Sequence, residues 1–300
     1  MGLYVAVVGA VNMDIHGQSD GALIARDSNP GVIRLAPGGV GRNIAHNLAL
    51  LGADVRMLTA LGDDLWAASL EQSCRDAGID LTESLRVPGG RSSSYLYITG
   101  SDGDMALAVC DAAIVDAVTP DWLARKLDFL NRAALVVADC NLSAAAIAFL
   151  AERVTAPLFV DPVSTTKARK LLPVLGRVHT LKPNAQEAEA LTGCADPAEA
   201  AAALVRLGVA RVFVSAGQDG MFCADRSGAA CRVPCCTARL ANANGGGDAA
   251  MAALCKAYLD GRDLADCARY AMAAGAIAVE SPETVAPGLS DAAVRARMMG

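Results

Sequence analysis

The sequence contains little that would bind a nucleic-acid chain or cross a membrane. Its 300 residues include no basic run and no basic patch interleaved with aromatic residues, and the formal net charge is −6. These features argue against an extended nucleic acid as a partner, but they leave a single nucleoside or nucleotide open. No apolar run reaches the length that spans a bilayer, so we expect a cytoplasmic protein without a membrane partner.

Two further absences concern targeting and metals. The apolar first residues, MGLYVAVVGAVNMD, lack a basic leader, which favours a first buried strand over a signal peptide. The ten cysteines include no CxxC pair, and no histidine lies near the group formed by Cys231, Cys235 and Cys236. Metal binding at this group is therefore a lesser alternative to reduced, buried thiols.

Strand and helix patterns alternate along most of the chain. Hydrophobic residues make up 53% of it, enough for a single large domain over residues 1–300 that buries roughly three quarters of its unfolded surface. The patterns predict strands at 3–9, 55–61, 134–138, 157–160, 178–181 and 211–215, and helices at 44–51, 64–78, 120–130, 143–153, 185–192, 196–208 and 249–259. This alternation is typical of a mostly parallel sheet with helices on both faces, in which ligands bind beyond the carboxyl ends of the strands.

Two segments depart from this alternation. Residues 15–37 are too irregular for a core layer, although they include the short β-prone run 32–35. Residues 92–110 have the pattern of a hairpin, because two β-prone runs flank the turn at 101–104. Together the two segments predict a small sheet that covers one end of the main domain.

The stretch Asn242–Asp248 holds three consecutive glycines directly before a predicted helix. Glycine lets the backbone turn sharply, and a helix N-terminus presents unpaired N–H groups backed by the positive end of the helix dipole. A phosphate is the natural occupant of such a turn, and Asp248 is suited to removing a proton from a hydroxyl that attacks it. A purely structural turn with an aspartate cap is an equal alternative on these residues alone.

A second glycine segment, Gly38–Asn43, lacks the Lys-Ser/Thr ending of a Walker A sequence, which argues against a P-loop nucleotide hydrolase. Its glycines allow the backbone to approach a small polar ligand. Asn43 can donate to and accept from sugar hydroxyls, and Asp14 can accept from two of them. A plain turn followed by a helix cap is the alternative.

Two later motifs also follow predicted strands. Asn184 and Glu187 are three residues apart on one helix face, where they could organise water around a Mg²⁺ ion that carries phosphates. The alternative is a carboxylate that only complements the helix dipole. The loop Ser215–Gly220 contains two glycines and could carry a nucleotide through backbone contacts.

Taken in order, these motifs make the chain resemble the PfkB, or ribokinase-like, family of carbohydrate and nucleoside kinases. The resemblance runs from Val5 to about Pro287, and its carriers are Asn-Met-Asp near the N-terminus, GGVGRN, the Asn184/Glu187 pair, SAGQDG and GGGD. It implies a three-layer α/β/α fold with a mostly parallel central sheet and a small β lid at approximately 15–37 and 92–110. It also implies that the lid pairs two subunits into a homodimer.

The resemblance further implies roles, position by position. Asp248 matches the catalytic base, and Gly245, Gly246 and Gly247 match its anion hole. The positions implied to bind substrate are Asn12, Asp14, Gly38, Gly39 and Asn43. The positions implied to serve ATP, with Glu187 also reaching Mg²⁺ through water, are Asn184, Glu187, Ser215, Gly217, Gly220, Ala274 and Ala278.

The run before the base departs from the family's usual Asp-Thr-Thr-Gly-Ala-Gly-Asp, since it reads Asn-Ala-Asn-Gly-Gly-Gly-Asp here. Asn242 keeps an oxygen but loses the charge, so the K⁺ site that is common in the family is in doubt at this position. Gly246 makes the anion hole more mobile, which would reduce its preorganisation.

Within the family, further segments are similar to those of pseudouridine kinases: 28–31 leading to 37–45, 102–105, 161–164 and 281–285. This similarity implies ATP-dependent phosphorylation of the 5′-hydroxyl of pseudouridine. The alternatives are another sugar or nucleoside substrate (ribose, adenosine or inosine) and a catalytically silent nucleoside-binding protein on the same fold.

Overall fold

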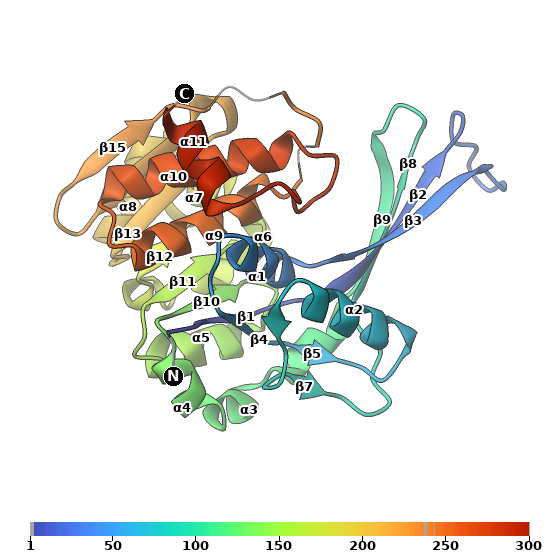
Figure 1. The fold of residues 1–300 in the computed structure, drawn as a ribbon, viewed down its shortest axis with the longest axis horizontal. Coiled ribbons are helices and arrows are strands. Elements are labelled where there is room, and N and C mark those ends of the chain that lie inside the picture. Colours follow the sequence, from blue (N-terminus) through green and yellow to red (C-terminus); the bar gives the residue numbers. More distant parts are fainter. Residues whose placement is uncertain (1–2, 237–238, 243, 300) are drawn as a thin grey trace.

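The computed structural model describes residues 3–236, 239–242 and 244–299, and it is built around one nine-stranded sheet (Figure 1). Its strands, in spatial order, are β15 (Ala230–Val233), β14 (Met221–Asp225), β13 (Arg211–Ser215), β12 (Thr180–Leu181), β11 (Leu158–Asp161), β10 (Leu135–Asp139), β1 (Val5–Val8), β4 (Val55–Leu58) and β6 (Ile79–Asp80). All neighbours are parallel except the antiparallel pairs β13–β14 and β14–β15. The predicted mostly parallel sheet is confirmed.

Helices cover both faces of this sheet, because alternate residues of each central strand face opposite sides. In β1, Val5 and Val7 pack into one hydrophobic core, whereas Ala6 and Val8 pack into the other. The first core includes α1 (Val40–Leu50), α2 (Leu65–Asp76), α9 (Gly246–Leu259), α10 (Leu264–Val279) and α11 (Asp291–Met299). The second includes α3 (Pro120–Ala124), α4 (Leu127–Arg132), α5 (Ala144–Arg153), α6 (Thr165–Ala168), α7 (Ala185–Thr192) and α8 (Pro197–Arg206). None of the helices in the described ranges is both long and apolar enough to cross a membrane.

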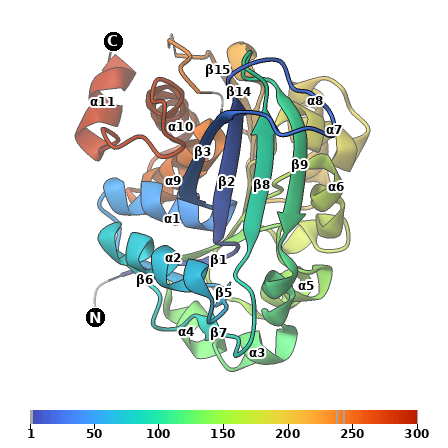
Figure 2. The same ribbon diagram turned by 90° about the vertical axis from the view of Figure 1, so that its right-hand side faces the viewer.

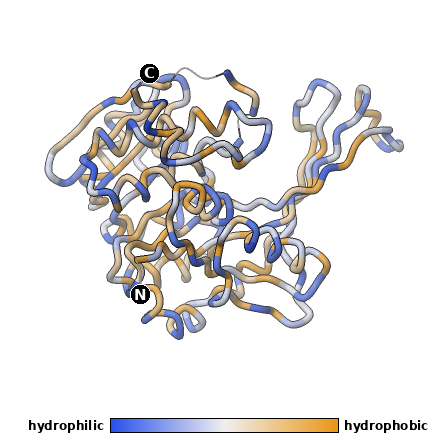
Figure 3. The backbone as a smooth tube through the Cα atoms, viewed as in Figure 1, coloured by the Kyte–Doolittle hydropathy of each residue, from blue (hydrophilic) through white to orange (hydrophobic). Residues whose placement is uncertain are grey.

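A second, four-stranded sheet extends from one side of this body, and we call it the projecting sheet (Figures 1 and 2). Its strands, in spatial order, are β3 (Gly31–Gly38), β2 (Asn12–Ser19), β8 (Ser94–Thr99) and β9 (Met105–Asp111). The two segments that depart from the alternating pattern in the sequence thus come together, and 92–110 forms the hairpin β8–β9. Hydrophobic segments concentrate in the body, whereas the tips of the projecting sheet are mostly hydrophilic (Figure 3).

Two predicted elements are each divided in the structure. The strand predicted at 55–61 ends at Leu58, and β5 (Ala60–Leu61) pairs instead with β7 (Leu85–Arg86) in a separate two-stranded sheet. Thr59 causes the break, because its amide bonds to Ser84 Oγ (3.2 Å) and its carbonyl accepts from the Leu85 amide (2.8 Å). The helix predicted at 120–130 is likewise two short helices, α3 and α4.

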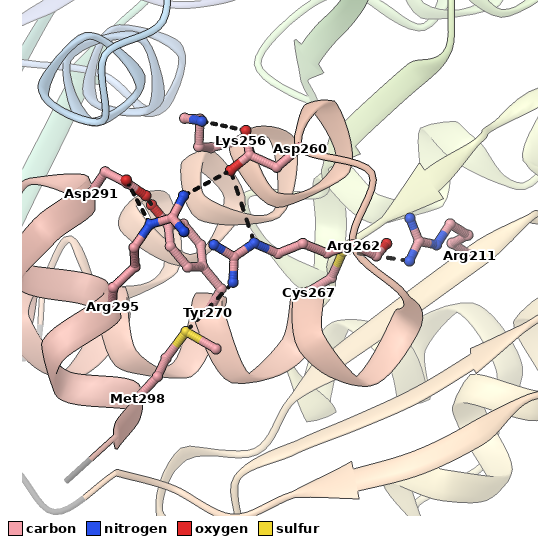
Figure 4. A network of polar contacts seen from close by, with 9 residues as sticks. All are labelled: Arg211, Lys256, Asp260, Arg262, Cys267, Tyr270, Asp291, Arg295 and Met298. Atoms are coloured by element: carbon pink, nitrogen blue, oxygen red, sulfur yellow. Dashed lines mark hydrogen bonds and ion pairs between the residues drawn. The ribbon is translucent and has the colours of Figure 1, made fainter.

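The C-terminal end of α9 and the first half of α10 are tied to α11 by polar contacts (Figure 4). Asp260, which follows α9, lies 3.9 Å from Arg262 and 3.6 Å from Arg295. The Arg262 guanidinium lies over the Tyr270 ring at 4.5 Å, and Tyr270 Oη donates to Asp291 Oδ1 (2.7 Å). These contacts hold the C-terminal end of α9 against α11.

Candidate active site

Helix α9 begins earlier than the sequence predicts, at Gly246 rather than Ala249. Gly245 is the N-cap with φ 85°, and a Cβ there would collide with the Thr284 carbonyl, so the position requires glycine. Two of the three glycines therefore belong to the first helical turn instead of a preceding loop. The backbone amides of residues 246–248 point out of that turn without an intrahelical acceptor, which makes them available to an anion.

Asp248 lies in the first turn of α9 and contacts the N-terminal part of α1. Asn43 Nδ2 donates to Asp248 Oδ2 (3.0 Å). Burial, together with the negative charge of Asp161, raises the pKa of Asp248 to about 7, although the Asn43 hydrogen bond and the Lys182 ammonium oppose the shift. A carboxylate with a pKa near neutrality is well matched to accepting a proton at physiological pH.

The predicted sugar-binding residues form a compact group where β2 begins and α1 follows β3. The Asn12 amide donates to the Asp14 carboxylate, and a Cβ on Gly38 would collide with that carboxylate. Gly39 is the N-cap of α1 with φ 97°. Burial raises the pKa of Asp14 to about 6, although the Arg42 charge and the Asn12 hydrogen bond oppose the shift. The structure thus brings the predicted sugar-binding group next to Asp248 through Asn43.

Three polar residues at the carboxyl ends of neighbouring strands also reach the site. Their positions after predicted strands indicate a shared cleft already in the sequence, but the sequence assigns no specific role to any of them. The buried Lys182 Nζ lies 3.2 Å from Asp161 Oδ2, and a Cβ on Gly247 would lie 3.6 Å from the same ammonium. Asp139, fully buried at the end of β10, accepts from the Ala10 amide (2.9 Å). The signal in the sequence that could identify these residues is their position. Each is the last residue of a buried parallel strand or the residue directly after one.

Asn184 and Glu187 form a complete capping box at the start of α7. Asn184 Oδ1 accepts from the Glu187 amide, and Glu187 Oε2 accepts from the Asn184 amide, both at 2.8 Å. A structural role of Glu187 at the start of the helix, which is the alternative to a Mg²⁺ role, is therefore present. The other carboxylate oxygen of Glu187, Oε1, takes no part in the capping box. Burial and the negative charge of Asp161 raise the pKa of Glu187. The Mg²⁺ role stays a prediction.

A cavity of about 540 Å³ lies between the loop after β13 and helix α10, and it extends to the N-terminus of α9. Its lining includes Ser215, Gly217, Gly220, Gly246, Gly247, Ala250, Ala271, Gly275 and Val279. The predicted contacts Ala274 and Ala278 are wrong, because both are fully buried in the core. The cavity is lined instead by their helical neighbours Gly275 and Val279, since a shift of one residue turns a helical side chain by about 100°.

Two predictions about ions and thiols can be compared with the structure. Asn242 Oδ1 accepts from the Asn244 amide (2.9 Å), and the K⁺ role of Asn242 stays a prediction. Within the described ranges, no group of three or more His, Cys, Asp or Glu side chains could hold a metal, so the lesser alternative at Cys231 finds no support. The ten cysteines are free, but Cys110 and Cys235 are exposed, contrary to the expectation of buried thiols.

Similarity to known proteins shows the family to which the chain belongs. The pfkB family of carbohydrate kinases matches residues 3–292. The chain belongs to this family. It is accordingly a phosphotransferase that acts on a hydroxyl group.

Two relatives of this pfkB-family kinase come from Escherichia coli. A pseudouridine kinase is 40% identical over 297 residues, covering 97% of this chain and 95% of the relative. An uncharacterised sugar kinase, YeiI, is 38% identical over 295 residues, covering 96% of this chain and 81% of the relative. These two relatives support a sugar or nucleoside kinase.

Solved structures confirm the ribokinase-like fold of the pfkB-family kinase. A carbohydrate kinase from Agrobacterium tumefaciens has a TM-score of 0.88 at 25% identity and covers 99% of this chain and 97% of its own. An Arabidopsis thaliana ribokinase in complex with ribose and ATP has a TM-score of 0.87 at 20% identity, with both chains fully covered. The three-layer α/β/α architecture expected from the resemblance is thus confirmed.

Proposed function

We propose that this kinase transfers the γ-phosphoryl group of ATP to the 5′-hydroxyl of pseudouridine. The observation that carries the proposal is the hydrogen bond from Asn43 to Asp248 (3.0 Å). It joins α1, which carries the predicted sugar-binding residue Asn43, to the proposed catalytic base Asp248 at the N-terminus of α9. A hydroxyl held beside Asn43 would lie next to Asp248 and next to the free amides of α9. The 40% identity to a pseudouridine kinase supports a nucleoside as acceptor.

In the proposed reaction, Asp14 and Asn43 hold the ribose hydroxyls. Asp248 accepts the proton of the 5′-hydroxyl as its oxygen attacks the γ-phosphorus, in line with the oxygen that leaves with ADP. Negative charge then develops on the transferring group beside the amides of residues 246–248. The Lys182 ammonium lies beside Gly247 in the first turn of α9. The amides and the ammonium would therefore stabilise the developing charge together, without rearrangement.

The cavity of about 540 Å³ suits ATP, because the cavity reaches Gly246 and Gly247 at the N-terminus of α9. The phosphates of ATP would meet the free amides there. Carboxylates outnumber cations here, since Asp161, Glu187 and Asp248 lie close enough to Lys182 to raise its pKa. This excess of negative charge fits a Mg²⁺ ion held mainly by phosphate oxygens and water, with Glu187 orienting the waters. Such an ion supplies further neutralisation of the phosphates when it is bound.

The test is a panel of acceptors assayed with Mg-ATP and K⁺ by ADP formation. We expect pseudouridine to give the highest kcat/KM, with uridine, ribose, adenosine and inosine well below it. Mass spectrometry of the product should place the phosphate on the 5′-oxygen. A higher kcat/KM for ribose, adenosine or inosine would assign the chain to another branch of the family and overturn the pseudouridine proposal.

One observation favours a second candidate, a nucleoside-binding protein without turnover. The side-chain oxygen of Asn242, where the family usually has aspartate, is already engaged by the Asn244 amide (2.9 Å). Calorimetry with pseudouridine separates the candidates: binding without ADP formation, in K⁺ as well as in Na⁺, would support the silent protein. ADP formation that depends on pseudouridine excludes it.

We also propose that two copies pair through the projecting sheet. One face of that sheet exposes aliphatic side chains on three strands: Ile33, Leu35, Leu96, Leu107 and Val109 are each between 39% and 75% exposed. Contiguous apolar surface of this kind is typical of a protein interface. Light scattering should give a dimer, and Ile33→Asp should give a monomer. A monomeric wild-type protein at micromolar concentration would contradict the pairing.

A further inference from the structure

One face of the projecting sheet carries aromatic and polar side chains in register with the sugar-binding carboxylate. Strands β2 and β8 pair so that Asp14 lies opposite Tyr95 and His16 lies opposite Tyr97. The side chains share a face, because His16 Nε2 lies 2.9 Å from Thr99 Oγ1, two residues further along β8. This face is therefore continuous with the proposed ribose site.

The rings on this face form a stacked group. The His16 and Tyr97 centroids are 4.4 Å apart at an interplanar angle of 10°, and Tyr95 lies 5.6 Å from Tyr97. Burial raises the pKa of Tyr97, and the negative charge of Asp14 adds to the shift, which ties this ring to the sugar site. Burial and the Arg34 charge lower the pKa of His16, so its imidazole is neutral at pH 7 and can both donate and accept.

A stacked ring pair across two strands also stabilises a sheet by itself. One other ring pair, Tyr4 and Phe129 at 5.0 Å, serves the core, since both rings are buried. His16 and Tyr97 are instead only half-buried. Cross-strand stabilisation explains why two rings stack, but it does not explain why they stand beside Asp14 in a site for a polar ligand.

Spacing along the strand matches the dimensions of a nucleoside. Asp14 and His16 are two residues apart on β2, which corresponds to roughly 6.6 Å. That is about the span from the ribose hydroxyls to the ring of the attached base. A ribose held at Asp14 would therefore carry its base over the His16–Tyr97 pair.

We propose that His16 and Tyr97 form the nucleobase platform of this site. The planar base packs over the edges of the two rings, and the His16 nitrogen that does not contact Thr99 exchanges a hydrogen bond with a carbonyl or N–H group of a uracil-type ring. These residues then determine the preference for a nucleoside over a free pentose. The inference rests on the proposed function, since a pentose kinase would have no use for such a platform.

The test compares Tyr97→Leu, which removes the ring, with Tyr97→Phe, which keeps it. Loss of a stacked aromatic should weaken the calorimetric Kd for pseudouridine by about 10- to 100-fold in Tyr97→Leu, whereas Tyr97→Phe should stay within about threefold of the wild type. Contact between the base and the rings acts equally on the ground and transition states, so KM should rise while kcat at saturation is retained. The Kd for ATP and the melting temperature of both variants serve as controls for the fold.

The outcomes separate this inference from the proposed function. A weakened Kd in Tyr97→Leu with no turnover in any form would support the platform and overturn the kinase proposal. An unchanged Kd, with the wild type phosphorylating pseudouridine, would overturn the platform and leave the kinase proposal intact. An equal loss in Tyr97→Leu and Tyr97→Phe, or a fall in kcat without a rise in KM, would also overturn it.

Discussion

The N-termini of α1 and α9 look alike in sequence but differ in what their glycines do. Each helix starts from a glycine with positive φ, 97° at Gly39 and 85° at Gly245. The two starts face one another, since Asn43 of α1 donates to Asp248 of α9 at 3.0 Å. A ligand that lies between them would touch both.

At α1 the glycines are required by close packing of protein against protein. A Cβ on Gly41 would lie 2.8 Å from Asp139 Oδ2 and 3.0 Å from the Cα of Gly9. At α9, a Cβ on Gly247 would have Lys182 Nζ, at 3.6 Å, as its only neighbour within 4 Å in the described chain. The glycines at the start of α1 are thus closely packed, whereas at α9 Gly245 and Gly246 are closely packed and Gly247 alone of the three is open toward the anion hole.

The largest expected effect concerns the carboxylate at the open helix. Asp248→Asn should lower kcat by about 10²- to 10⁴-fold, because an amide cannot accept the hydroxyl proton. A coupled assay of ADP formation measures the loss, and an unchanged calorimetric Kd for pseudouridine shows that the sugar side is intact. Turnover close to that of the wild type would contradict the assignment of Asp248 as the base.

Paired alanine substitutions test the comparison directly. Gly41→Ala should destabilise the protein by about 1–3 kcal/mol, because its methyl group overlaps Asp139 and Gly9. Gly247→Ala should leave the free energy of unfolding equal or slightly higher, since alanine is the better helix former, while its methyl group obstructs the anion hole. Urea titration and kcat report the two effects, and loss of stability in Gly247→Ala with normal kcat would reverse the distinction.

The pH dependence should reveal the raised pKa at α9. Because Asp248 must be ionised and its pKa is about 7, log kcat/KM should fall by about one unit per pH unit below pH 7. A steeper fall should follow below pH 6, where Asp14, with a pKa of about 6, also takes up a proton. A profile that stays flat from pH 5.5 to pH 8 would show that neither carboxylate limits the reaction.

A further expected effect concerns the pH dependence of stability. Folding raises the pKa of Asp248 from 3.8 to about 7, so ionisation of this carboxylate destabilises the folded state as the pH rises through that window. Asp248→Asn should therefore melt at a higher temperature than the wild type at pH 8. The difference should shrink by pH 5 and vanish near pH 4. A lower melting temperature for the variant at pH 8 would mean that the Asn43–Asp248 contact outweighs the cost of burial.

Much of the fold follows from local patterns. The alternating runs predict the parallel strands and the helices, and Gly52 ends α1 at φ 85° as its position suggests. The errors occur where a distant partner decides. Thr59 breaks a strand because of Ser84 and Leu85, and Ala274 turns inward because α10 packs its alanines against α9. Periodicity indicates which residues share a helical face, but an all-small helix gives no signal for which face is buried.

By itself, the sequence determined the order of the motifs, the family they resemble and the placement of Asp248 in a glycine-rich helix start. Only the tertiary structure decided which of these glycines is open, since that depends on what a Cβ would meet from residues far along the chain. It also decided that Asn43 reaches Asp248 across 205 positions and that Lys182 pairs with Asp161 beside the anion hole. Turns and helix starts are fixed by neighbours in sequence, whereas burial, charge and free space are fixed by neighbours in space.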